Sequence, residues 1–487
     1  MIRRAINKYK SLSSGVKAGL WFTLCNMIQK GISFIVMPIF TRIMPQADYG
    51  IYSTYTSWYN FLMIFTSLRL SYYVFSKGMV KYEEDRDEFV VSLQSLSTTA
   101  TVVIFLFYLM FRDAANSFLG LSTSLMVCMF VHMFFEPSVE YWTARKRFEY
   151  DYKKVVFVSL GIAIINPLLG IVMVLGTDNA VFARALSTTI AVSVFGLALY
   201  IVIIRKGNKL FSLKYWKYAL AFNIPLIPHF LSSTALSQAD RVMIRNLVGP
   251  ESTAIYSVAY SLGMVTLLFS QAIQQALLPW QYTKIKNKNY RNLPEIATIT
   301  MVIIAAINIA FIAFAPEVVR IVAPVSYGEA IWAMPPVCSA VFFMYLFNMF
   351  ANIEYYFEET KYVAVASILA ALVNIGLNWL FIPAFGYVAA GYTTLVCYIL
   401  LAISHYICMK KITKKHGFEV EVYDTKAILL VSFGMIVLLA VMMAVYDMVV
   451  VRYCVIAIIC LIGYSNRKKL KTVLSLIKTK GNGKKET

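Results

Sequence analysis

The sequence has little charge for its length. Only 14% of its 487 residues are charged, 59% are hydrophobic, and the mean hydropathy is +0.67. A water-soluble globule of this size would need more polar surface to cover its exterior. The composition therefore excludes an ordinary soluble protein and indicates that a lipid bilayer is the main solvent.

Sequence motifs of nucleotide and metal chemistry are also missing. There is no P-loop, no glycine-rich dinucleotide turn and no nucleophile elbow, which argues against an ATP-driven pump on this chain alone. The cysteines have no metal-ligand spacing and the histidines form no triad, so packing or interfacial positions are expected for both. The cysteines are Cys25, Cys128, Cys338, Cys397, Cys408, Cys454 and Cys460. The histidines are His132, His229, His405 and His416.

Long apolar stretches are abundant and are separated by short charged segments. Many of the stretches are long enough for a transmembrane helix of about 20 residues, and only helices or closed barrels satisfy their backbone hydrogen bonds in a bilayer. The basic start MIRRAINKYK precedes a long apolar stretch without a small-residue cleavage site, which predicts a retained first helix. The fourteen predicted helices span residues 16–40, 48–74, 89–111, 118–143, 154–175, 180–204, 217–247, 252–282, 293–315, 328–352, 362–383, 387–408, 427–446 and 449–464.

Basic residues alternate with the predicted helices. If the N-terminus is cytoplasmic, 36 of the 45 lysines and arginines fall in the leader, the inner loops and the tail. This is the asymmetry expected of a multi-pass protein with both termini inside. The net charge of +20 is then mostly membrane-anchoring charge, including ARKR at 144–147 and RKKLK at 467–471, and gives no reason to expect nucleic-acid binding. The outer loops are short, so any chemistry is expected inside the helix bundle or at its ends.

Two motifs recur six helices apart. Residues 51–53 and 255–257 both read IYS, and VEYW at 139–142 corresponds to IEYY at 353–356. After each of the latter comes a helix containing asparagine and then a glycine: Asn166 and Gly176, then Asn374, Asn378 and Gly386. The pairing predicts an internal duplication with both halves in one membrane orientation and a substrate path between them, although chance recurrence of tyrosine and glycine remains the alternative. The predicted lobes are residues 1–204 and 205–408, followed by two appended helices in 409–466 and a basic cytoplasmic tail in 467–487.

Charges inside predicted spans are functional candidates, because each costs at least a few kcal/mol in hydrocarbon. Lys30 is expected about 18 Å into its helix, near mid-bilayer. Arg69 is expected nearer the inner side, where snorkelling to the cytoplasm is an equal alternative. Asp240 and Arg241 are expected near the outer end of helix 7, and as neighbours on a helix they need not pair. Lys30, Arg69 and Arg241 could form a cationic ladder for a phosphate or pyrophosphate; the alternative is interfacial anchoring by the arginines and a helix-to-helix salt bridge by Asp240.

Further candidates come from polar side chains and prolines at particular places in the repeat. Gln271 and Gln274 share a helix face with Gln275 and could bind sugar hydroxyls, although ordinary interhelical hydrogen bonding is the more frequent role. Glu140 and Glu354 occupy equivalent places at the cytoplasmic ends of helices 4 and 10, as an inner gate or as interfacial residues. The hinge candidates, in the first helix of each lobe, are Pro38, Pro225 and Pro228.

Three segments carry a family resemblance. They begin with VKAGLWFTLCNMIQKGISFIVMPIFTRIMPQADYGIYSTY, continue with PLIPHFLSSTALSQADRVMIRNLVGPESTAIYSVAYSLG, and end with NIGLNWLFIPAFGYVAAGYTTL. With these segments the chain resembles the Wzx-type O-antigen and capsular polysaccharide flippases, also called polysaccharide biosynthesis proteins, of the multidrug/oligosaccharidyl-lipid/polysaccharide (MOP) exporter superfamily. Ala254 departs from the glycine expected there, as at Gly50, which suggests a slightly different turn.

The resemblance implies an all-α, MATE-like bundle in the bacterial inner membrane that moves an undecaprenyl-pyrophosphate-linked oligosaccharide outward by alternating access. It implies Lys30, Arg69 and Arg241 as headgroup residues, with Asp240 orienting Arg241 or taking part in ion coupling. No cofactor is expected; coupling to a Na⁺ or H⁺ gradient or to the membrane potential is possible within such a family. The expected partners are the lipid-linked oligosaccharide, membrane lipids, and polymerase and chain-length proteins of a lipopolysaccharide or capsule pathway.

Three alternatives stay open. A peptidoglycan-precursor flippase is a near relative with the same predicted helix count. A MATE-type multidrug exporter is disfavoured because organic cations favour acidic cavities, whereas helix 1 has no acidic residue and contributes Lys30. A polysaccharide polymerase or ligase is disfavoured by the short outer loops.

Overall fold

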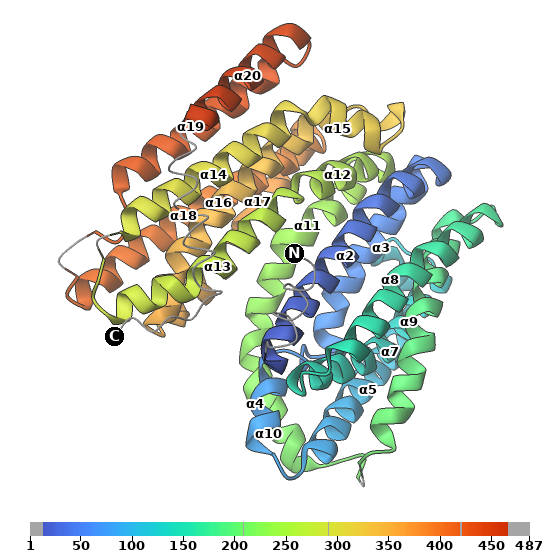
Figure 1. Ribbon diagram of the computed structural model, residues 1–487. Helices are drawn as coiled ribbons and strands as arrows, with labels where there is room; N and C mark the ends of the chain where they lie inside the picture. Colours follow the sequence, from blue (N-terminus) through green and yellow to red (C-terminus); the bar gives the residue numbers. More distant parts are fainter. Residues whose placement is uncertain (1–12, 208, 291, 419–420, 466–487) are drawn as a thin grey trace, which may run out of the picture. The chain divides into compact units, whose positions relative to one another are not determined.

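The structure is a computed structural model that describes residues 13–207, 209–290, 292–418 and 421–465 (Figure 1). The leader through residue 12, the segment RKKLK and the predicted tail from residue 467 lie outside the described residues. Within the described part, eleven helices are long and apolar enough to cross a membrane, or twelve if α6 (Arg112–Leu119) and α7 (Thr123–Phe148) form one bent span. The predicted all-α multi-pass class is confirmed, and the number fourteen stays a prediction.

The chain divides by its contacts into two units, Met1–Thr234 and Ala235–Thr487, and the division falls within α11 (Ile227–Leu247). The predicted lobe boundaries at residues 204 and 408 stay a prediction. Each unit has its own helix packing and its own buried polar groups.

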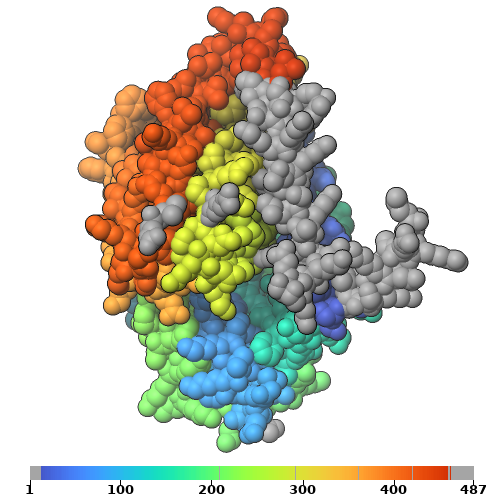
Figure 2. All heavy atoms as spheres, turned by 60° about the vertical axis from the view of Figure 1, so that its left-hand side comes forward, coloured from blue at the N-terminus to red at the C-terminus, as the bar shows by residue number. Residues whose placement is uncertain are grey.

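In the first unit, α7 packs on α5 and α9, while α8 packs on α9 and α2. The short helices α4 and α10 lie against α5 and against each other at the lower end of Figure 2. The other helices of this unit are α2 (Ser14–Ile43), α3 (Gln46–Thr66), α4 (Tyr73–Lys81), α5 (Arg86–Met110), α8 (Tyr152–Leu175), α9 (Ala180–Ile204), α10 (Leu213–Asn223) and the 3₁₀ turn η1 (Ile224–Leu226).

In the second unit, α16 is the central helix and packs on α12, α13, α14 and α18. Helix α19 runs beside α14 on the surface of this unit (Figure 2). The helices are α12 (Pro250–Gly263), α13 (Thr266–Lys286), α14 (Leu293–Ala313), α15 (Ala315–Val322), η2 (Val325–Tyr327), α16 (Ala330–Tyr356), α17 (Thr360–Phe385), α18 (Val388–Lys415), α19 (Thr425–Ala444) and α20 (Val449–Ser465).

The same helix pairs pack in both units. The contacts of α7 with α9, α8 with α9, and α5 with α7 correspond to those of α16 with α18, α17 with α18, and α14 with α16. Each unit therefore repeats one packing scheme over helices six apart in the predicted count. This pattern agrees with the duplication indicated by the IYS and EY motifs.

Three predicted helices are broken in the structure. The predicted helix 48–74 ends at Thr66 and resumes as α4 at Tyr73, with left-handed backbone at Leu68 (φ 50°) and Arg69 (φ 49°) between them. The predicted helix 217–247 is interrupted by η1, where Pro225 lacks the N–H that an α-helix needs. The predicted helix 252–282 breaks between Gly263 and Thr266, where the Thr266 hydroxyl donates to the Gly263 carbonyl (2.9 Å). Hydropathy does not detect such breaks because the apolar stretches continue through them.

Gly78 allows α4 to approach α5 closely. A Cβ atom at this position would lie 2.1 Å from Cζ of the buried Phe89 ring. Gly19, on an exposed face of α2, has nothing within 4 Å of the corresponding point.

We expect Gly78→Ala to lower the free energy of unfolding by about 1–3 kcal/mol, because overpacking forces a well-packed ring to move. Thermal unfolding of the detergent-solubilised protein, followed by a thiol-reactive dye, measures the change. Gly19→Ala is the matched control, and equal stability of the two variants would contradict the close packing of α4 on α5.

Candidate functional site

A fully enclosed polar cluster of the second unit surrounds Asp240, near the end of α11. Its side chain is fully buried, and its Oδ2 accepts hydrogen bonds from the Tyr256 hydroxyl (2.5 Å) and the Thr394 hydroxyl (2.9 Å). Its Oδ1 accepts from Nδ2 of Asn378 (2.7 Å). The cluster thus joins α11, α12, α17 and α18 through one carboxyl group, and its tyrosine belongs to the repeated IYS motif.

A second layer of amides and hydroxyls surrounds that carboxyl group. Asn378 donates to Oδ1 of Asn374 (3.3 Å) and accepts from the Thr393 hydroxyl. Asn374 in turn donates to the Thr394 hydroxyl (3.4 Å). These side chains are all buried. Among the described residues no basic side chain forms an ion pair with Asp240, so its direct hydrogen-bond partners are all neutral, and the charge of Arg241 acts on it only through space.

Arg241 points away from its acidic neighbour. Its guanidinium donates to the Ser237 carbonyl (2.8 Å) and to Oε1 of Gln238 (3.2 Å), and Cζ lies 4.4 Å from the centre of the Tyr260 ring. The expectation that Asp240 and Arg241 need not pair agrees with this geometry. Arg241 is 8% exposed, so its side chain is mostly covered by neighbouring groups, including local carbonyl oxygens and the aromatic ring.

Lys30 belongs to an exposed polar stripe on α2 in the first unit. Thr23, Asn26, Lys30 and Ser33 are all exposed, and their spacing places them on one helix face. The hydroxyl groups of Thr23 and Ser33 donate to carbonyl groups one turn earlier. A lysine facing hydrocarbon near mid-bilayer would cost at least a few kcal/mol, so such a stripe is typical of a water-filled path.

Arg69 lies in the left-handed turn between α3 and α4 instead of within a helix. Its N–H donates to Oγ of Ser67 (3.2 Å), and Cζ lies 5.7 Å from the centre of the Tyr72 ring. Within the described residues its guanidinium forms no ion pair and no side-chain hydrogen bond. A non-glycine residue in this conformation costs about 1–3 kcal/mol and is found disproportionately at functional sites.

The two glutamates of the EY motif have different surroundings. Glu140 is partly exposed and accepts from the Ser71 hydroxyl (2.7 Å), next to the turn that holds Arg69. Glu354 is fully buried, and its Oε1 lies 2.8 Å from Nδ1 of the equally buried His405. Their equivalence in the repeat therefore does not extend to their partners, and a gating role stays a prediction for both.

The glutamines and prolines are distributed over separate parts of the chain. Gln274 donates to the Tyr345 carbonyl (3.2 Å) and lines a small pocket between α13, α14 and α16, whereas Gln271 is exposed. Pro38 lies inside the continuous helix α2. Pro225 and Pro228 are exposed at the break between α10 and α11, where the backbone is already interrupted.

Two clusters in the first unit were not predicted from the sequence. In one, Oε2 of Glu136 accepts from the Tyr59 hydroxyl (2.5 Å) and lies 2.6 Å from Nε2 of His132. In the other, the buried Arg184 donates to Asn166 (2.6 Å) and Thr188 (2.9 Å). The helical spacing of His132, Glu136 and Glu140 was a visible signal for the first cluster. For the second, the only signal in the sequence is a single basic residue, Arg184, inside an apolar stretch.

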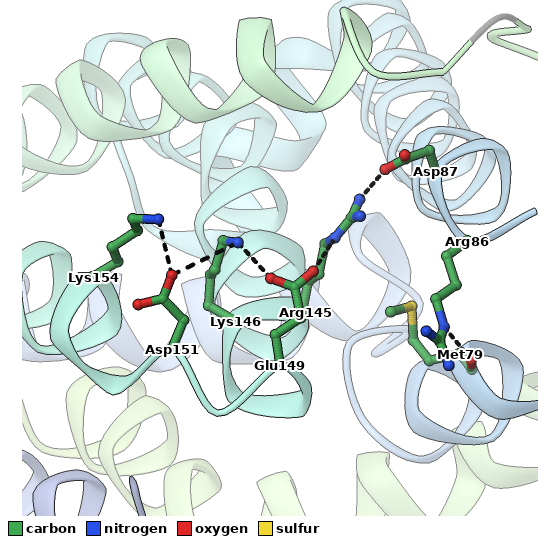
Figure 3. A network of polar contacts seen from close by, with 8 residues as sticks. All are labelled: Met79, Arg86, Asp87, Arg145, Lys146, Glu149, Asp151 and Lys154. Atoms are coloured by element: carbon green, nitrogen blue, oxygen red, sulfur yellow. Dashed lines mark hydrogen bonds and ion pairs between the residues drawn. The ribbon is translucent and has the colours of Figure 1, made fainter. Parts of the chain in front are cut away.

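An ion-pair network lies at the C-terminal end of α7 in the first unit (Figure 3). Arg145 pairs with Asp87 of α5 and with Glu149 (2.8 Å), and Lys146 pairs with Glu149 and lies 3.9 Å from Asp151. Partial burial opposes ionisation of Glu149, but hydrogen bonds from Lys146 and Arg145 outweigh it and lower the pKa of the carboxyl group. The stability that this group contributes is therefore present at neutral pH and is lost as the pH falls through the lowered pKa.

The fold defines a class first, that of multi-pass helical membrane proteins. The structure of a lipid II flippase, MurJ, in an inward closed conformation aligns with 93% of this chain and all of its own, with a TM-score of 0.71 and 14% identity. An inward-facing MATE-family multidrug resistance transporter of the MOP superfamily aligns with 82% of this chain and all of its own, with a TM-score of 0.60 and 15% identity. At these identities the likeness shows the fold alone.

Sequence comparison gives the family. The family described as "Polysaccharide biosynthesis protein" matches residues 16–283, more than half of the chain, so the chain belongs to that family. A protein of the Lsg locus of Haemophilus influenzae is 22% identical over 289 residues, which cover 56% of this chain and 67% of that protein. The resemblance drawn from the sequence is thereby confirmed at the level of family and fold.

We expect Tyr256→Phe to lower the free energy of unfolding by about 1.5–3 kcal/mol, because a hydrogen bond to a buried charged group is lost. Thermal unfolding in detergent measures the effect. Tyr398→Phe is the control, since Tyr398 is buried in the same unit and its hydroxyl forms no hydrogen bond within the described residues. Equal losses in both variants would contradict a specific contribution of the Tyr256 hydroxyl.

Proposed function

We propose that this protein is a Wzx-type flippase that moves an undecaprenyl-pyrophosphate-linked oligosaccharide repeat unit across the bacterial cytoplasmic membrane by alternating access. Family membership and the transporter fold support the class. The observation that carries the substrate is the polar stripe of α2, which exposes Lys30 and contains no acidic residue. An anionic diphosphate headgroup complements such a face, whereas an organic cation does not.

The proposal assigns separate roles to the headgroup and the lipid tail. The polyprenyl chain stays in hydrocarbon, while the diphosphate and glycan follow the hydrated stripe of the first unit and meet Lys30 and Arg69 there. Arg241 is a separate headgroup candidate in the second unit. Gln271 and Gln274 are candidates for sugar contacts, Glu140 and Glu354 for gates, and Pro38, Pro225 and Pro228 for hinges. Both termini are cytoplasmic in this proposal, and a polymerase and chain-length proteins act on the product outside.

Deletion of the gene is expected to leave lipid-linked repeat units on the cytoplasmic side of the membrane. Lys30→Ala is expected to slow flipping about tenfold or more, because a charge-assisted hydrogen bond contributes ~1.5–3 kcal/mol. Complementation is measured as surface glycan, and accessibility of the lipid-linked units to a membrane-impermeant lectin in spheroplasts gives their sidedness.

Two variants on the same helix serve as controls. Lys30→Arg keeps the charge and should retain most of the activity, and Lys17→Ala removes a charge thirteen residues earlier on α2. Full complementation by Lys30→Ala would contradict the proposed headgroup contact. Lipid-linked units that accumulate outside in the deletion strain would instead indicate a polymerase or ligase, and rescue of peptidoglycan synthesis would indicate the peptidoglycan-precursor flippase.

Asp240 is the candidate for coupling to a Na⁺ or H⁺ gradient in the second unit. The carboxyl group and the two hydroxyl oxygens that contact it, those of Tyr256 and Thr394, are the kind of ligands that alkali cations use, and the carboxyl group can equally bind a proton. Membrane potential alone is the competing source of energy. Asp240→Asn keeps the shape of the side chain and removes the charge.

In inverted vesicles with an imposed Na⁺ or pH gradient, Asp240→Asn is expected to make flipping independent of the gradient, since its charged acceptor is gone. Asp178→Asn, in the exposed loop between α8 and α9, is the control and should respond as the wild type does. An unchanged gradient dependence in Asp240→Asn would rule out this residue as the coupling site.

A further inference from the structure

One face of α7 carries three titratable side chains in a row. His132, Glu136 and Glu140 are spaced i, i+4 and i+8, which places them along about 12 Å of a single helix face. His132 is 7% and Glu136 is 30% exposed at the side chain, and Glu140 is partly exposed. Placing such a row inside an apolar helix costs free energy. Apolar residues would pack the helix without that cost, so the row points to a function.

Glu136 is shared between two groups that can exchange a proton. Its Oε2 accepts from the Tyr59 hydroxyl of α3 (2.5 Å) and lies 2.6 Å from Nε2 of His132. The Tyr59 and His132 rings are stacked, with centroids 4.5 Å apart. Nδ1 of His132 has no hydrogen-bond partner within the described residues.

The positive charge that acts on this row is Arg69. It is close enough to Glu136 and Glu140 to influence both electrostatically, yet it forms no ion pair or side-chain hydrogen bond within the described residues. The carboxyl group of Glu140 is anchored instead to Ser71, two residues beyond Arg69. The guanidinium is thus available to a ligand while it stabilises the two carboxylates at a distance.

The remaining charged and titratable groups around α7 are engaged elsewhere. Tyr55 of α3 acts on Tyr59. Asp87 of α5 pairs with Arg145 at the far end of α7, and Arg184 of α9 bonds to Asn166 and Thr188. From α8, Asp151 pairs with Lys154. The lysines of α4, Lys77 and Lys81, lie over the rings of Phe222 and Tyr218, and Arg112 of α6 pairs with Asp113. Proton exchange in this row therefore depends on its own three groups, Tyr59 and Arg69.

We propose that His132, Glu136 and Glu140, with Tyr59, form a proton-binding site of the first unit that is linked to the binding of an anion at Arg69. When a phosphate group takes the guanidinium as its counter-ion, the two carboxylates lose part of their stabilising charge, and one proton from water binds to the row. No other bond forms or breaks. By linkage, a bound proton then favours anion binding to the same degree.

The inference rests on the proposed function only for the identity of the anion, a lipid diphosphate. It differs from the Asp240 proposal because it lies in the other unit and combines a proton with the substrate. The sign follows directly: anion binding takes up a proton, so affinity for the anion rises as the pH falls. The row releases that proton when the anion leaves.

The test is calorimetric titration of the purified full-length protein in detergent with a polyprenyl diphosphate, repeated in buffers of different ionisation enthalpy between about pH 5 and pH 8. Wild-type protein is expected to take up close to one proton per diphosphate bound. Its affinity for the diphosphate should fall up to tenfold for each unit by which the pH rises across the titration range. Glu136→Gln and His132→Gln should bind the diphosphate with little or no proton uptake. Arg69→Gln should lose both binding and linkage, and Arg69→Lys should retain the linkage in part.

Tyr59→Phe and His416→Gln complete the set. Tyr59→Phe keeps the stacked ring and removes only the hydroxyl donor, so it should shift the pH at which the proton is taken up without abolishing binding. His416→Gln changes an exposed histidine at the end of α18 and should match the wild type. Binding without proton uptake in the wild type, or undiminished uptake in both Glu136→Gln and His132→Gln, would overturn the inference and leave the flippase proposal intact.

Infrared difference spectra of the ligand-free protein over the same pH range decide the site independently of the ligand. We expect a carboxyl band that titrates in the wild type and is lost or shifted in Glu136→Gln. If the spectra titrate as expected but no variant and no wild-type sample binds the diphosphate, the proposed substrate is wrong, and so is the linkage to it. If no band changes in Glu136→Gln, the proton site is wrong even where binding is normal.

Discussion

A polar group that a helix carries into hydrocarbon has to find its partners within reach of that helix, because no water is there to replace them. Asp240 meets this constraint with three donors from three other helices, and Arg184 meets it with amide and hydroxyl acceptors and two aromatic faces. Each cluster fixes how its helices pack, since a shift of one helix would leave a charge unsatisfied. The helix packing of each unit thus depends on a few buried polar residues as well as on apolar area.

The two units meet the constraint with opposite charges that come from non-equivalent helices, Asp240 from α11 and Arg184 from α9. The hydroxyl of Tyr256, in the second IYS motif, donates to Asp240. The ring of Tyr52, in the first, lies against the Arg184 guanidinium, with Cζ of Arg184 5.1 Å from the ring centre. Asn378 donates to the acid, and Asn166 accepts from the base. The tyrosine of the IYS motif and an asparagine therefore recur as supporting groups, whereas the central charge differs both in sign and in the helix that carries it. A cation or proton can be attracted by the second cluster, but the first already contains a tethered cation.

The sequence was sufficient for the long helices and insufficient for their interruptions. The apolar stretch 180–204 coincides with α9, and 154–175 lies within two residues of α8, because hydropathy reports directly on burial in lipid. The break that holds Arg69 depends on left-handed backbone at two non-glycine residues, which no local pattern signals. Asp240 was visible as a charge in a span, but its partners Asn378 and Thr394 lie 138 and 154 residues away in the chain. Only the tertiary structure reveals which polar residues meet.

The same distinction separates two kinds of cation in the first unit. Arg184 is surrounded by hydrogen-bond acceptors and aromatic rings, so few of its N–H groups are available to a ligand. Arg69 lies on a strained turn whose conformation costs free energy without giving its guanidinium an ion-pair partner. A fold retains such a cost where an unpaired charge is useful, and an unpaired cation above two carboxylates is suited to exchange its counter-ion. An anion that binds there changes the proton affinity of Glu136 and Glu140 through space, so substrate and proton can be linked within one unit before any helix moves.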